Sequence, residues 1–176
     1  MMRNMNPDTL SNMMNMVNQN PNLMQQAMQM SQNAGFPGMQ NNNNYYLHEQ
    51  KFLMEIENCK SKGNIHFKKE EFNTASLIYF ESLIKIKEFR KNNKNIYLKN
   101  DLQILENKIR LNYGISKLKL GDFQKVIDSA KIVFENNQSG KSSYYLALGL
   151  FHKGDFKNAL SYAKKSKAIE LSLIHI

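Results

Sequence analysis

The sequence has little of what a membrane, secreted or disulfide-stabilised protein requires. Its single cysteine, Cys59, excludes an internal disulfide framework. It contains no run of about 18 apolar residues, so no membrane span is visible. The N-terminus lacks the charged start and apolar stretch of a secretory signal. Because disulfides mark oxidising compartments, these absences favour a reducing one, and we expect a cytoplasmic protein.

Proline and charge are almost confined to opposite parts of the chain. All three prolines and ten of the eleven methionines lie before residue 44, where only Arg3 and Asp8 are charged. Most of the other residues there are asparagine and glutamine. Chains of this composition cannot bury enough apolar surface to fold alone. We therefore expect residues 1–44 to be a low-complexity, partly disordered leader.

Two short helices are an alternative for parts of this leader. Asn6-Pro7 and Asn20-Pro21 each have the form of an N-cap followed by proline at the first helical position. Apolar residues spaced for one helix face follow each pair. Methionine-rich faces suit the binding of hydrophobic clients. Isolated helices this short are marginal in water, so the sequence leaves both descriptions open.

The remainder, residues 45–176, contains no proline, and its apolar residues recur at helical spacing. This pattern predicts an all-α domain of paired helices. We expect the first helix of each pair at about 47–68, 96–119 and 140–152, and the second at about 72–91, 124–136 and 157–173.

An internal repeat organises these helices. Leu120-Gly121-Asp122-Phe123 recurs 33 residues later as Lys153-Gly154-Asp155-Phe156, and Lys69-Glu70-Glu71-Phe72 is an earlier copy. A period near ~34 residues is typical of tetratricopeptide repeats (TPRs), in which helix pairs stack into a superhelix. The first two copies are 51 residues apart, which predicts long facing helices. The three units are expected at about 55–92, 107–138 and 140–173.

Particular segments resemble known TPR proteins. Lys62-Gly63-Asn64-Ile65-His66-Phe67, with Phe72 and Ala75, resembles the opening repeat of co-chaperone TPR domains. The long first spacing and the segment Arg110 to Phe123 are similar to the TPR domains of large immunophilins and of the plant chloroplast outer-envelope chaperone receptor. The resemblance implies a protein–protein interaction adaptor that is not an enzyme and needs no cofactor.

The resemblance also implies a binding site. Chaperone-binding TPR domains grip the acidic C-terminal tail of heat-shock proteins of the 70-kDa and 90-kDa classes with a five-residue carboxylate clamp. Four matching positions here are Lys60, Asn64, Asn112 and Lys141, but the fifth, normally arginine, is Tyr145. A tyrosine offers one neutral hydroxyl where arginine offers paired charged donors. Losing one hydrogen bond to a charged group costs about 1.5–3 kcal/mol, so the change predicts weaker binding or a different tail.

Other assignments compete with this one. The departure at Tyr145 favours a TPR scaffold that binds an unrelated peptide, and a third alternative is the TPR fragment of a larger immunophilin-type prolyl isomerase. The net charge of +9 would steer an acidic tail toward the protein. Its lysines are scattered, so we do not expect nucleic acid as a partner.

The remaining candidate residues predict no chemistry. The four histidines fall in no metal-binding spacing, so we expect no metal site, and Cys59 is expected to pack between helices. The chain ends on an apolar run from Leu171 to Ile176, whereas repeat arrays end in a polar capping helix. We therefore expect a truncated C-terminus or a foreign tail. A missing membrane anchor there would place the protein at an organelle surface.

Overall fold

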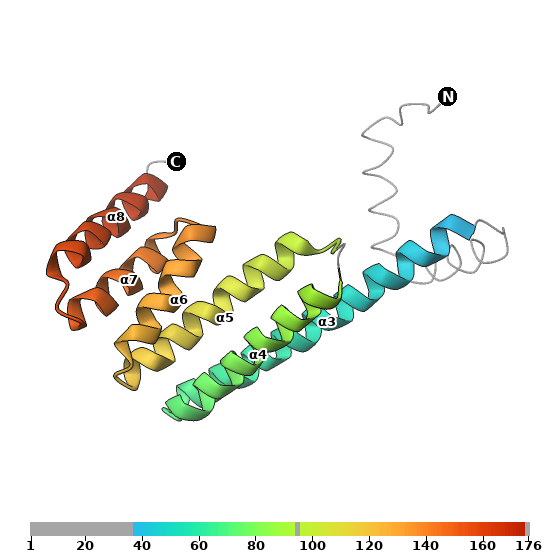
Figure 1. The fold of residues 1–176 in the computed structure, drawn as a ribbon, viewed down its shortest axis with the longest axis horizontal. Coiled ribbons are helices and arrows are strands. Elements are labelled where there is room, and N and C mark those ends of the chain that lie inside the picture. The colour runs from blue at the N-terminus through green and yellow to red at the C-terminus, as the bar shows by residue number, and fades with distance from the viewer. Residues whose placement is uncertain (1–36, 94–95, 175–176) are drawn as a thin grey trace. The chain divides into compact units, whose positions relative to one another are not determined.

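The computed structural model of the protein describes residues 37–93 and 96–174. The chain divides into two compact units, Met1–Leu47 and His48–Ile176. Both short helices expected in the leader lie outside the described residues. Six helices form in the described part (Figure 1): α3 Pro37–Lys68, α4 Phe72–Asn92, α5 Lys99–Lys119, α6 Phe123–Asn136, α7 Gly140–His152 and α8 Phe156–Ile174. None of these helices is both long and apolar enough to cross a membrane.

The all-α prediction is confirmed, and the helix bounds agree with the expected ones to within a few residues, except at the first helix. That helix, α3, begins at Pro37, about ten residues before the expected start. Proline suits the first position of a helix because its missing N–H would have no partner there. The asparagine run that follows Pro37 has weak helix propensity but contains no second proline to end the helix.

The turn within each helix pair explains the repeated sequence motif. Gly121 and Gly154 adopt φ angles of +76° and +82°, a left-handed conformation that glycine reaches without steric cost. The aspartate that follows each glycine caps the next helix. Asp122 accepts from the backbone N–H of Lys125 at 3.3 Å, and Asp155 accepts from that of Asn158 at 3.2 Å. Glycine therefore reverses the chain and aspartate starts α6 and α8.

The first turn departs from this pattern. Glu70 takes the place of the glycine with a φ of +62°, and Glu71, in the place of the aspartate, makes no side-chain cap to α4. The carboxylate of Glu71 instead pairs with Nδ1 of His66, across the turn. This turn is therefore made from residues with a higher conformational cost than those in the other two turns.

The core is concentrated where α3, α4 and α5 meet. Its buried members are Ile56, Ala75, Tyr79, Ile86, Phe89, Leu102, Leu105 and Ile109. The rings of Phe52 and Phe89 stack with their centroids 3.9 Å apart. Close approach of α3 and α4 requires a glycine, because a Cβ on Gly63 would lie 2.8 Å from Cζ of Tyr79. A glycine at position 63 therefore lets the ring of Tyr79 pack directly against α3.

The long spacing between the first two motifs lengthens α4 and α5, as predicted. Each has 21 residues, against 14 in α6 and 13 in α7. A buried carboxylate secures the start of α5: Glu49 of α3 accepts from the backbone N–H groups of Tyr97 at 3.0 Å and Leu98 at 2.8 Å. The first amides of a helix lack partners within the helix, so an acidic side chain there stabilises its N-terminus.

Candidate functional site: the lysine groove

A groove of about 500 Å³ runs across the side of α5 that lies between α3 and α7. We call it the lysine groove because three lysines and four asparagines line it, together with a serine and three aliphatic residues. No carboxylate is among these described lining residues. They are Lys60, Asn64, Ile104, Asn107, Lys108, Leu111, Asn112, Val133, Asn137, Ser139 and Lys141. Four of the five positions singled out from the sequence therefore lie in one groove.

The two asparagines are oriented by a buried tyrosine. The hydroxyl of Tyr79 donates to Oδ1 of Asn64 at 2.7 Å, and Nδ2 of Asn112 donates to the same oxygen at 3.0 Å. Tyr79 is 1% exposed, and burial raises the pKa of its phenol to about 12. The hydroxyl therefore keeps its proton at neutral pH. Because the Asn64 oxygen is engaged by the protein, its amide nitrogen is the group left for a ligand.

The lysines of the site come from helices that are separate in sequence. Lys60 lies one turn before Asn64 on α3, half-buried, with its ammonium paired to Glu57. Lys141 is exposed at the second position of α7. Ser139, the residue before α7, caps that helix by accepting from the N–H of Ser142 at 3.2 Å. Lys141 therefore lies in the first turn of α7, at the positive end of the helix dipole.

Tyr145 is the predicted position that the groove does not include. It lies one turn after Lys141 on α7 and is half-buried. Its ring makes an edge contact with that of Tyr144, with centroids 5.2 Å apart, and burial raises the pKa of its phenol. Tyr145 is thus a neutral side chain packed against a neighbour, outside the groove lining.

Sequence reasoning missed four polar residues that line the groove: Asn107, Lys108, Asn137 and Ser139. Lys108 is exposed on α5, four residues before Asn112. The same four-residue spacing separates Lys60 from Asn64 and Lys141 from Tyr145, and it places both residues on one helix face. This recurring lysine was a signal in the sequence that would have identified Lys108.

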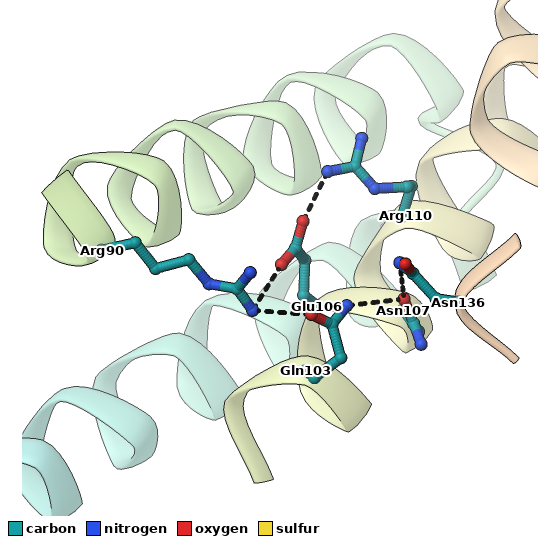
Figure 2. A network of polar contacts seen from close by, with 6 residues as sticks. All are labelled: Arg90, Gln103, Glu106, Asn107, Arg110 and Asn136. Atoms are coloured by element: carbon teal, nitrogen blue, oxygen red, sulfur yellow. Dashed lines mark hydrogen bonds and ion pairs between the residues drawn. The ribbon is translucent and has the colours of Figure 1, made fainter. Parts of the chain in front are cut away.

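Asn107 is held in place by a chain of amides (Figure 2). Its Oδ1 accepts from Nε2 of Gln103 and from Nδ2 of Asn136, each at 3.1 Å. Gln103 in turn accepts from Nη2 of Arg90 at 3.0 Å. This network joins polar side chains of three different helices. The spacing of apolar residues in the sequence does not predict it, so only the folded chain shows it.

Comparison with known proteins rests on structure. No family model and no curated protein matches the sequence. Among solved structures, the C-terminal TPR-containing domain of an FK506-binding protein of Plasmodium falciparum superposes with a TM-score of 0.61. It is 25% identical in sequence, and the match covers 69% of this chain and 81% of that one. The chain therefore has a TPR-like, all-α helical-repeat fold. Its repeats resemble those of an immunophilin, as predicted, and TPR domains are typically non-catalytic modules that bind peptides of partner proteins.

Proposed function

We propose that the lysine groove binds the free C-terminus of an acidic peptide tail, of the kind carried by heat-shock chaperones of the 70-kDa and 90-kDa classes. The protein would then be a co-chaperone adaptor. The observation that carries the proposal is the convergence of Lys60, Asn64, Asn112 and Lys141 from three helices on one groove lined without a carboxylate. A tail that ends in aspartate presents two carboxylates at its last residue.

The chemistry of the groove suits these carboxylates. Lysine ammonium groups supply charge, and asparagine amides supply directed donors whose orientation Tyr79 holds. Hydrogen bonds with a charged partner are about twice as strong as neutral ones. A preorganised donor also loses less side-chain entropy on binding. The net charge of +9 adds long-range steering of an acidic tail.

The clamp position that is normally arginine is Tyr145 in this chain. Lys108 supplies a positive charge in place of that arginine. It brings a third cation to the same groove, on the helix face that also carries Asn112. A lysine is a point charge and cannot make the paired contacts of arginine. We therefore expect a clamp that recognises charge more than bidentate geometry, with affinity that falls steeply as salt concentration rises.

Calorimetric titration with a short peptide ending in Glu-Glu-Val-Asp, beside the same peptide with an amidated terminus, tests the proposal. We expect a Kd of about 1–100 µM for the free acid, and binding at least about tenfold weaker after amidation, from the loss of a charged hydrogen bond. Lys141→Ala and Lys108→Ala should each weaken binding by about fivefold to a hundredfold.

Lys167→Ala is the matched control, because Lys167 is exposed on α8 and is not a lining residue of the groove. It removes one positive charge and should leave the Kd within about twofold. Equal losses of peptide affinity in Lys167→Ala and Lys108→Ala would show that the net charge of the protein, and not a contact in the groove, causes the effect. No binding of either peptide would remove the chaperone tail as the ligand and leave a TPR scaffold for another peptide.

A further inference from the structure

A second groove, of about 440 Å³, lies on the opposite side of α5, between α4 and α6. We call it the arginine groove after Arg90 and Arg110, which line it with Phe80, Ile84, Glu106 and Ile132, among others. Successive helical residues are separated by about 100°, so Arg110 and Lys108 point about 160° apart around α5. The two grooves therefore share a helix but no lining residue.

Charge in this groove is unbalanced in favour of cations. Arg90 and Arg110 share a single buried carboxylate, that of Glu106, at 3.0 Å and 2.5 Å (Figure 2). Lys87 and Lys125 also line the groove, against one further carboxylate, Asp128. Two guanidinium groups on one carboxylate leave N–H donors uncommitted. No described residue accepts a hydrogen bond from the buried Nε of Arg110.

The guanidinium groups are held in place before any ligand arrives. Nη2 of Arg90 donates to Oε1 of Gln103 at 3.0 Å as well as pairing with Glu106. Gln103 is itself tied to Asn107 in the chain of amides that Figure 2 shows. An arginine fixed in this way presents its remaining donors with little further loss of side-chain entropy.

An apolar wall accompanies these cations. Phe80 and Ile84 of α4 are 47% and 41% exposed, and Ile132 of α6 is 39% exposed. All three line the arginine groove. Aromatic and aliphatic side chains beside arginine are the composition expected at the centre of a protein–protein interface.

We propose that the arginine groove binds an amphipathic acidic segment of a partner protein. Its carboxylate would lie against Arg110 and Arg90, and its apolar side chains would cover Phe80, Ile84 and Ile132. Nucleic acid is the poorer match, because a phosphate backbone would not cover the apolar wall formed by Phe80, Ile84 and Ile132. This second groove does not depend on the occupant of the lysine groove.

The test is an NMR titration of the ¹⁵N-labelled protein with acetyl-Glu-Leu-Phe-Glu-Leu-amide. Its blocked ends remove the terminal carboxylate that the lysine groove is proposed to need. We expect shifts concentrated at residues of the arginine groove, with a Kd of about 0.1–1 mM. The same peptide with glutamine in place of both glutamates should bind at least about tenfold more weakly, since it lacks the charge-assisted bonds.

Two variants separate a binding site from a fortuitous shift. Ile132→Glu places a carboxylate in the wall and should weaken binding at least about tenfold. Leu77→Glu makes the same change at a residue of α4 that is 61% exposed and outside the groove lining, and it should leave the Kd within about twofold. Both variants alter exposed positions, so the thermal unfolding midpoint should stay close to that of the parent.

Other outcomes would overturn the proposal. These are equal binding of the glutamine peptide, shifts confined to the lysine groove, or no shifts at about 5 mM peptide. Displacement of the peptide by an oligouridylate at lower concentration would identify a phosphate site instead. A Glu-Glu-Val-Asp titration in the same sample reports on the lysine groove alone, so failure of one groove leaves the other separately testable.

Discussion

The two ends of the helical array bury side chains of different size. Where α3, α4 and α5 meet, the buried side chains are large, such as Ile56, Tyr79 and Ile109. In the pair α7 and α8, the buried residues are mostly small, with Leu146 as an exception, and several large apolar residues are exposed. Phe151, Phe156 and Leu160 are 54%, 63% and 58% exposed.

The small residues of the last pair permit direct contact with backbone. Oγ of Ser143 donates to the carbonyl of Tyr162 at 3.1 Å, and Oγ of Ser166 donates to that of Gly140 at 2.9 Å. These hydroxyls are buried yet satisfied, so they do not incur the cost of an unpaired polar group. The comparison teaches that one repeat pattern supports two kinds of packing: apolar volume at the start and close polar contact at the end.

Truncation of a buried isoleucine should show the largest difference between the two ends. Ile109 is 0% exposed, so Ile109→Ala should lower the free energy of unfolding by about 2–5 kcal/mol through lost burial and a cavity. Ser166→Ala in α8 removes one hydrogen bond and should cost about 0.5–1.5 kcal/mol. Chemical denaturation measures both. Similar costs at the two positions would contradict the division of packing.

Alkaline pH should lower the stability of the core formed by α3, α4 and α5, because Tyr79 lies in it. Below pH 10 the phenol is protonated whether the chain is folded or unfolded. Because burial raises its folded pKa from 10.0 to about 12, the unfolded chain loses this proton first as pH rises. The free energy of unfolding should therefore fall by about 2–3 kcal/mol between pH 10 and 12.

Tyr79→Phe isolates this contribution from those of other groups that titrate in the same range. Phenylalanine keeps the buried ring of Tyr79 and its packing, because the substitution removes only the hydroxyl. Between pH 10 and 12, the free energy of unfolding of this variant should fall by about 2–3 kcal/mol less than that of the parent. Parallel pH profiles for the two proteins would show that Tyr79 does not titrate as its burial requires.

The turns provide the smallest and most symmetrical test. Glu70→Gly in the first turn should raise the free energy of unfolding by about 0.5–1 kcal/mol, because Glu70 has a φ of +62°. Gly154→Ala in the last turn should lower it by about 1 kcal/mol, because φ is +82° there. A Cβ added at this position would meet no atom within 4 Å, so the whole cost comes from the backbone conformation. Thermal unfolding of both variants checks the opposite signs. The same sign in both would exclude backbone strain as the cause.

Part of the candidate site was predictable because it follows helical spacing. Lys60 and Asn64 share a face at four-residue separation, and the repeat register led to Asn112 and Lys141. The prediction did not extend to the surroundings of these residues. Tyr145 matches the register of the site but lies outside the groove lining, and its ring contacts that of Tyr144.

The sequence by itself determined the helices, the turns and the order of the repeats in the residues that the structure describes. These depend on local causes: apolar spacing of 3.6 residues, glycine in a left-handed turn and aspartate at a helix start. Only the tertiary structure decided which side chains meet across helices. Tyr79 orients Asn64 across α3 and α4, and Glu106 joins two arginines from α4 and α5. Contacts between helices depend on the rotation and spacing of each helix, and no local pattern encodes them.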